Sequence, residues 1–313
     1  MDVELPWLED FLAVIEAGGF SRAAVRRHVT QPALSRRIRS LEAWIGTPLF
    51  ERNTHTVILT RGGAAFRPIA EDILRRVASG REEVLETAHA ATGTLRFAAT
   101  HNLSQNFFPN WYRDLASGAE SGVMLQLFSA NMEACERLLI AGDVHFLLAH
   151  YHAATPTRLP PARFQSMRLG IDRIVPVSAP ASSDSSAPRF PLPGIADAPL
   201  PHLTYHPGSG VGRIVAGTFS AWEQTPYLQA TFTGPAMLLV EMARDGQGVT
   251  WSPHDLVEAD LRTGRLRLAG GPEWEIPIET RLFRPRLRLS KTAELFWTRA
   301  KQATANHDCK AEL

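Results

Sequence analysis

The 313-residue sequence lacks the patterns on which most catalytic and metal sites depend. It contains no Gly-x-Ser-x-Gly segment, no glycine-rich phosphate loop and no His-Glu-x-x-His pair. Those arrangements supply a nucleophile, a phosphate cradle or two zinc ligands. Its two cysteines, Cys135 and Cys309, are too far apart to match any metal-binding spacing. We therefore expect no enzymatic activity, no cofactor and no metal site.

The scarcity of cysteine and the charged start of the chain also bear on location. A secretory signal would begin with a basic segment and an apolar run, whereas this chain begins MDVELPWLED. Two distant cysteines are typical of proteins that work in a reducing compartment. These features predict a cytoplasmic protein with no membrane partner.

Carboxylates are absent from residues 17–41, although the whole protein is nearly neutral, with 33 Lys and Arg against 32 Asp and Glu. Solvated helix faces usually mix both signs of charge. An acid-free basic face indicates binding to a phosphate backbone, and therefore to nucleic acid. The arginines of this run are Arg22, Arg26, Arg27, Arg36, Arg37 and Arg39.

The apolar residues around this run predict three short amphipathic helices, and thus a helix-turn-helix. Ser21 and Thr30 stand where a hydroxyl can cap a helix, and Pro32 falls in a first turn, where proline is tolerated. Small residues at the front of the third helix would let the backbone approach DNA, while Gln31 and Arg36 are long enough to reach bases in the major groove.

The N-terminal 60 residues resemble the DNA-binding domain of LysR-type transcriptional regulators. The resemblance lies in SRAA, TQPALSRRIRSLE and the wing entry IGTPLFER. It implies a winged helix-turn-helix over residues 1–60. It also implies base contacts from Gln31, Pro32, Ser35 and Arg36, phosphate contacts from Ser21, Thr30 and Arg37, a wing opened by Arg52, and further contacts from Arg22 and Arg39. Asn53, Thr54, His55 and Thr56 replace the arginines common in the family's wing, which shifts the expected specificity toward the third helix.

Residues 61–91 predict a linker helix with a single apolar stripe, about 45 Å long. Such a helix has nothing of its own to bury against, so we expect it to pair with the same helix of a second subunit. The stripe comprises Phe66, Ile69, Ile73, Val77, Val84 and Ala88. By resemblance, the dimers assemble into a tetramer, and RNA polymerase is a further candidate partner.

From residue 92 to 313 the pattern alternates between strands and helices, which predicts an α/β domain with mostly parallel strands. We expect two subdomains, the first over 93–166 plus 269–305 and the second over 167–268, with a long surface loop at 176–201. This layout resembles the effector domain of LysR regulators, which is of periplasmic-binding-protein type. The fold class expected for the chain is therefore α plus α/β.

Polar residues at the ends of the predicted strands are the candidates for binding a small effector between the subdomains. Ligands of open α/β sheets collect where strands end and helices begin. The candidates are Thr100, His101, Asn102, Ser104, Phe128, Ser129, Asn131, His150, Tyr151, Tyr205, His206, Gly208, Ser209, Thr250 and Trp251.

Three alternatives stay open beside control by a reversible organic ligand. A solute-binding protein would share the α/β layout but not the arginine-rich helices. His150 and His152 would face the same way on a strand, which is a feature of metal sensing, although no partner set accompanies them. YHPGSGVGRIVAGTF and ARDGQGVTW resemble the hypochlorite-responsive subgroup of the LysR family, which is linked to methionine oxidation. Leu115, Val211 and Pro235 stand at the positions that align with its redox methionines.

These observations predict a DNA-binding transcriptional regulator controlled by a small-molecule effector of unknown identity. An equivalent regulator that senses oxidative or metal stress is the alternative.

Overall fold

A computed structural model describes residues 3–51, 57–89, 93–116, 123–155, 157–182, 185–221 and 226–311. The chain divides into two compact units. One comprises Met1–Ala90 with Ile140–Gly142, and the other comprises Ala91–Leu139 with Asp143–Leu313. Among the described residues, no helix is both long and apolar enough to cross a membrane.

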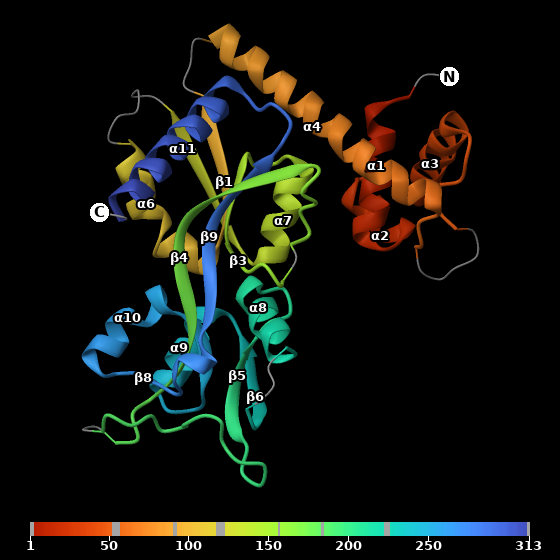
Figure 1. Ribbon diagram of the computed structural model, residues 1–313. Helices are drawn as coiled ribbons and strands as arrows, with labels where there is room; N and C mark the ends of the chain where they lie inside the picture. The colour runs from red at the N-terminus through yellow and green to blue at the C-terminus, as the bar shows by residue number, and fades with distance from the viewer. Residues whose placement is uncertain are drawn as a thin grey trace. The chain divides into compact units, whose positions relative to one another are not determined.

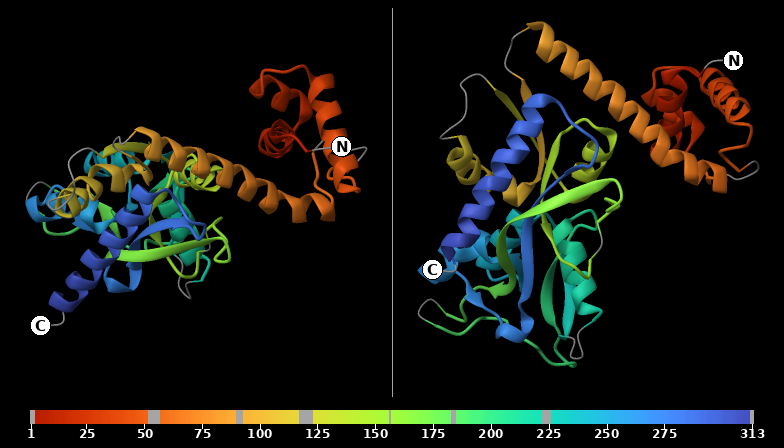
Figure 2. Two further views of the ribbon diagram at one scale, coloured as in Figure 1. Left: turned by 90° about the horizontal axis from the view of Figure 1, so that it is seen from above. Right: turned by 45° about the horizontal axis from the view of Figure 1, so that its top comes forward.

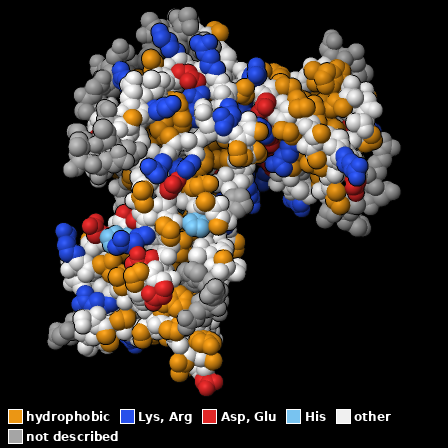
Figure 3. Space-filling model, in the orientation of Figure 1, with side chains coloured by type: hydrophobic (Ala, Val, Ile, Leu, Met, Phe, Trp, Pro, Cys, Tyr) orange, Lys and Arg blue, Asp and Glu red, His pale blue; other side chains and the backbone are white. Residues whose placement is uncertain are grey.

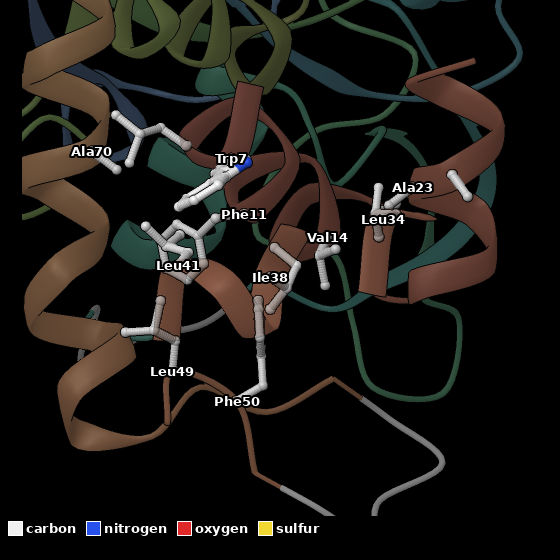
Figure 4. Packing of buried hydrophobic residues seen from close by; sticks show 13 residues of the cluster. Trp7, Phe11, Val14, Ala23, Leu34, Ile38, Leu41, Leu49, Phe50 and Ala70 are labelled. Carbon is white, nitrogen blue, oxygen red and sulfur yellow. The ribbon is translucent and has the colours of Figure 1, made fainter. Parts of the chain in front are cut away.

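Three helices begin the first unit: α1 (Leu5–Ala17), α2 (Phe20–Arg26) and α3 (Gln31–Ile45). Their apolar faces meet in one core, in which Phe11, Leu34 and Leu41 are fully buried. Figure 4 shows the side chains of this cluster pointing toward one another. The tight turns after α1 and α3 need a left-handed backbone, which glycine adopts without strain, at Gly18 (φ 61°) and Gly46 (φ 87°).

The two predicted helix caps have different outcomes. Thr30 is the N-cap of α3, where its side chain accepts a hydrogen bond from the Ala33 backbone N–H at 3.4 Å, and Pro32 lies in the first turn, as predicted. Ser21 does not cap α2. The helix begins at Phe20, so its N-cap is Gly19 and Ser21 lies inside the first turn.

After α3, Phe50 and Leu59 form an antiparallel bridge that brings the chain back beside itself. The segment between them contains Arg52 and the four residues that follow it, and the wing predicted there falls outside the described residues. Gly63 makes the return possible, because a Cβ at this position would lie 2.1 Å from the backbone oxygen of Leu49.

The long helix α4 (Arg61–His89) completes the first unit, and both views of Figure 2 show it as one continuous helix. Its first turns pack on the helical core through Phe66 and Ala70. Further along, four apolar side chains remain 36–67% exposed: Ile69, Ile73, Val77 and Val84. The predicted stripe also included Ala88, whose side chain lies outside the described residues.

In the second unit, the described strands form two sheets (Figure 1). The larger has the strand order β2-β1-β3-β9-β4-β7, with β8 also paired to β4, and the smaller joins β5 and β6. The strands are β1 (Thr94–Thr100), β2 (Met124–Ala130), β3 (Phe146–Tyr151), β4 (Phe164–Ser178), β5 (Leu200–Tyr205), β6 (Leu228–Gly234), β7 (Thr250–Pro253), β8 (Arg267–Leu268) and β9 (Ile276–Pro285).

Helices connect most of these strands. They are α5 (His101–Gln105), α6 (Phe108–Ala116), α7 (Met132–Ala141), α8 (Gly210–Phe219), α9 (Ala236–Arg244), α10 (His254–Thr263) and α11 (Lys291–Ala311), with a 3-10 turn at Pro272–Trp274. The sequence pattern located most of these elements, but α10 was not predicted.

The expectation of mostly parallel strands is wrong for the described sheets. Parallel pairing joins β1 to β2, β1 to β3 and β5 to β6. The pairs β3–β9, β4–β9, β4–β7 and β4–β8 are antiparallel. The reason is topological: β9 returns late in the chain and inserts between β3 and β4, and local hydrophobic patterns carry no information about that direction.

The long strands β4 and β9 contribute to two separate cores. Met167 on β4 and Leu282 on β9 pack with the aromatic cluster beneath α6 and α11. Ile174 on β4 and Ile278 on β9 pack instead around Trp251, beside α8. Figure 1 shows the two strands running together from one lobe of this unit to the other. The strands β4 and β9 therefore connect the two lobes.

Candidate functional site

The exposed end of α3 carries the residues expected to contact DNA bases. Gln31, Pro32 and Arg36 are exposed, and Ser35 is half-buried beside them. Arg39, one turn further along, donates a hydrogen bond to the Ser35 Oγ at 3.2 Å. The start of α3, which Thr30 caps, therefore exposes the long polar side chains of Gln31 and Arg36.

Two arginines of the basic run are tied to an acid that precedes the run in sequence. Asp10 on α1 is fully buried, and its carboxylate accepts hydrogen bonds from Arg27 Nε at 2.8 Å and from Arg37 Nη1 at 3.1 Å. Arg27 also pairs with Glu9. No acid lies within the run in sequence. In the folded domain, however, the carboxylates of Glu9 and Asp10 on α1 pair with its arginines.

Arg22 has a structural role of its own. Its guanidinium donates to the backbone oxygens of Ala17 and Gly18, both at 2.6 Å, and so satisfies carbonyls at the C-terminal end of α1. Ser21 is exposed next to it. Of the predicted DNA contacts, Arg36 and Arg39 are exposed arginines that no ion pair with a described residue occupies, and Arg52 lies outside the described residues.

A cavity of about 410 Å³ lies between the lobes of the second unit. Eight of the fifteen predicted effector residues line it: Thr100, His101, Asn102, Asn131, His150, Tyr205, His206 and Ser209. The prediction from strand ends thus identified lining residues, such as Thr100 and Ser209, that are more than a hundred positions apart in the sequence.

The other seven candidates lie outside the cavity lining. Ser104 and Ser129 stand behind His101: the Ser129 Oγ is 2.9 Å from His101 Nδ1 and 2.8 Å from the Ser104 Oγ. Gly208 is buried beside Asn131, Phe128 is exposed, and the Tyr151 ring lies under the Arg281 guanidinium.

Thr250 and Trp251 were predicted to bind the effector, but neither lines the cavity and both are completely buried. The Thr250 Oγ1 donates to the Leu203 backbone oxygen, and the indole N–H of Trp251 donates to that of Trp274. Their polar atoms bond within the core of the second lobe, because all four residues of β7 are buried although the strand ends the sheet.

One wall of the cavity was not predicted; it lies at the end of β6 and consists of Thr233, Gly234, Pro235 and Ala236. The same strand-end rule, applied to β6, would have found it. The lining is completed by Ala130, Met132, Gly210 and Val211.

Three helices begin at the cavity: α7 after Asn131, α8 after Ser209 and α9 after Pro235. The Asn131 Oδ1 accepts from the Ala134 N–H at 2.9 Å, and the Ser209 Oγ accepts from the Gly212 N–H at 3.2 Å. Helix N-termini carry partial positive charge and free N–H groups. No Asp, Glu, Lys or Arg stands among the described lining residues.

Two polar atoms of lining residues are buried without hydrogen-bond partners among the described residues, Thr100 Oγ1 and His150 Nε2. Burial lowers the pKa of His150 to about 4, so its ring is neutral at physiological pH. Burial also raises the pKa of Tyr205, whose hydroxyl donates to the Trp251 backbone oxygen at 2.7 Å. A ligand in the cavity would therefore contact neutral polar side chains and the backbone dipoles of helix N-termini.

Comparison with known protein families identifies both units. Residues 5–64 match the bacterial regulatory helix-turn-helix of the lysR family, and residues 88–305 match the LysR substrate binding domain. The chain belongs to the LysR family of transcriptional regulators. The predicted fold class, an N-terminal helix-turn-helix with a C-terminal effector domain, is confirmed.

This LysR-type regulator is similar along nearly its whole length to characterised relatives. It is 29% identical over 306 residues to the transcriptional regulator YjiE of Escherichia coli (strain K12), covering 96% of this chain and 95% of that protein. The full-length structure of HypT from Salmonella typhimurium, a hypochlorite-specific LysR-type regulator, matches 97% of this chain and 99% of that one at 27% identity and a TM-score of 0.57.

Vibrio fischeri DarR in complex with DNA is a further relative of known structure. Its chain is 28% identical, with a TM-score of 0.54, and the match covers 96% of this regulator and 99% of DarR. HypT has thus been solved at full length, and DarR in complex with DNA. The regulator's surface carries basic and acidic side chains side by side over the face shown in Figure 3, in keeping with a net charge of +1.

Proposed function

We propose that this LysR-family regulator reads promoter DNA with the N-terminal end of α3 and is controlled by a small anionic effector in the 410 Å³ cavity. The observation that carries the effector class is the convergence of α7, α8 and α9, whose N-termini all begin at the lining. Three partial positive charges face a cavity whose described lining holds no acidic side chain.

For DNA binding, the proposal assigns base contacts to Gln31 and Arg36. Both are exposed at the start of α3, where a recognition helix enters the major groove. An Arg guanidinium pairs with guanine and a Gln amide with adenine. Thr30 keeps its predicted place beside a phosphate, since its capping bond to Ala33 uses only one lone pair of the hydroxyl.

The proposal also includes a homodimer formed through α4, with dimers assembling into tetramers. The exposed apolar stripe of α4 supports it, because a helix with 46% of Val77 and 67% of Val84 in water gains by covering them. Effector binding would draw together the two lobes that β4 and β9 connect, and the changed lobe geometry would alter the spacing of DNA-binding domains in the oligomer.

The effector class is tested by adding a negative charge where the anion is expected. Ala236 is the first residue of α9 and lines the cavity. Ala236→Asp should leave the free protein at least as stable, since Asp is favourable in the first turn of a helix. We expect it to abolish the rise in Tm that small carboxylates, phosphates or halides cause in the wild-type protein.

Leu238→Asp is the matched control, because Leu238 lies in the same helix turn but is exposed and outside the lining. It should keep the anion response. Equal Tm responses of wild type and Ala236→Asp to every anion, or a wild-type response confined to neutral analogues, would exclude an anionic effector at this site.

A further inference from the structure

Three potential metal ligands meet at the place where the lobes of the effector domain join. His150 comes from β3, Asp172 from the middle of β4, and Asp255 from the first turn of α10. One ligand atom of each side chain lies within 4.8 Å of the others. The three residues are widely separated in the chain, so only the folded domain brings them together.

His150 is a buried residue whose ring has an unsatisfied nitrogen among the described residues. Its side chain is 5% exposed, and its Nε2 has no hydrogen-bond partner among the described residues. A buried polar nitrogen without a partner destabilises the folded state, so folded proteins rarely leave one. A neutral imidazole in this position has a lone pair available for a cation.

The carboxylates of Asp172 and Asp255 lie close to each other, beside the His150 ring. The backbone N–H of Asp255 points to the Asp172 Oδ2 at 3.5 Å, and the Asn102 amide points to the Asp255 Oδ1 at 3.4 Å. Among the described residues neither forms an ion pair with Lys or Arg. Two like charges held this close together disfavour each other.

We propose that His150, Asp172 and Asp255 bind one first-row divalent cation, Mn²⁺ or Zn²⁺, at the junction of the two lobes. A cation would give the imidazole nitrogen a partner and neutralise the two carboxylates together.

The donor set decides the class of ion. Imidazole is a ligand of zinc and other transition metals, whereas carboxylate oxygens suit manganese and the harder ions. One imidazole with two carboxylates therefore favours Mn²⁺ or Zn²⁺ over Mg²⁺, which prefers oxygen and water. Ligand atoms at about 2.1 Å from one ion are roughly 3–4 Å apart, so the side chains have to close in by about an ångström.

The site is positioned to affect effector binding. His150 and Asn102 both line the cavity, so a cation here adds positive charge at its edge. Three protein ligands leave coordination positions free for water or for an oxygen of the effector. This last step rests on the proposed function, but metal binding itself does not.

The test uses the full-length protein, stripped of metal with a chelator and titrated with MnCl₂. Bound Mn²⁺ loses its six-line solution EPR spectrum, so the free ion is counted directly. We expect one Mn²⁺ per chain, displaced by ZnCl₂ and not by an equal concentration of MgCl₂. Asp255→Asn and Asp172→Asn should each weaken binding about tenfold or more.

Asp255 is exposed, so its variant should fold, and relief of the like-charge pair should raise the Tm of the metal-free protein. Asp245→Asn, at another exposed aspartate of the same domain, is the matched control and should bind like wild type. Absence of Mn²⁺ binding at 1 mM, or binding unchanged in both site variants, would overturn the proposal. Neither result would affect DNA binding, so the proposed function would stand or fall separately.

Discussion

The buried carboxylate of Asp10 on α1 accepts a hydrogen bond from Arg37 Nη1 on α3, at 3.1 Å. The contact joins the first helix to the helix expected to read DNA, and Arg27 binds the other oxygen of the same carboxylate at 2.8 Å. Neighbouring arginines of α3 therefore differ in role: Arg37 holds the domain together, while Arg36 is exposed.

Substitution of the exposed Arg36 should change sequence recognition without unfolding the domain. Arg36→Ala should cost about 1–3 kcal/mol of binding to the preferred site and relax preference at one base pair, since a bidentate base contact is lost. Sites selected from random DNA, followed by fluorescence anisotropy, provide the measurement. Arg36→Lys is the control that keeps the charge. A uniform loss across all sequences would instead identify Arg36 as a phosphate contact.

Asp10→Asn should destabilise the DNA-binding unit by roughly 2–3 kcal/mol, because two arginines lose a buried charged acceptor. Urea denaturation followed by circular dichroism measures the change. Glu9→Gln is the comparison: Glu9 pairs with the same Arg27, but its side chain is 44% exposed. Its cost should stay below about 1 kcal/mol. Equal effects of the two substitutions would contradict a structural role specific to Asp10.

Val77→Glu should dissociate the oligomer without unfolding the subunit. Val77 is 46% exposed on α4, so a charge there costs the single chain little, but it would be buried in a helix pair. Light scattering after size-exclusion chromatography should show a smaller mass than wild type. Arg76→Glu, at the exposed neighbouring position, controls for the added acid. An unchanged mass for Val77→Glu would remove this face of α4 from the interface.

His202 should make the effector domain less stable in mild acid. Burial lowers its pKa from 6.5 to about 4, so between these values the unfolded chain binds a proton that the folded one does not. Stability from this group is complete above pH 6.5 and falls by roughly 2–3 kcal/mol as the pH drops to 4. His202→Gln should flatten that part of the stability curve in urea titrations at several pH values. A slope identical to that of wild type would show that His202 is not the group responsible.

Local patterns were sufficient wherever the physics is local. The spacing of Leu34 and Ile38 predicted a helix, the hydroxyl of Thr30 predicted its cap, and short apolar runs predicted most strands of the effector domain. The strand-end rule found eight cavity residues because the ends of neighbouring parallel strands, such as β1 and β3, meet at one sheet edge. In these cases the chain neighbours of a residue determine its environment.

Partners distant in sequence were decided only by the tertiary structure. Ser21 looked like a cap until the start of α2 was known, and Arg37 looked free until α1 brought Asp10 beneath it. Thr250 and Trp251 looked like strand-end ligands, but both faces of β7 are covered.

The sequence by itself determined the family, the basic helices and the alternation of strands and helices, because each is written in residues close together along the chain. The direction of β9, the burial of β7 and the meeting of His150 with Asp172 and Asp255 depend on contacts between segments that are distant in the chain. Such contacts form only when the lobes assemble around β4 and β9. Hydrophobic burial stabilises the complete fold, and the separate segments do not bury enough apolar surface to fix these contacts.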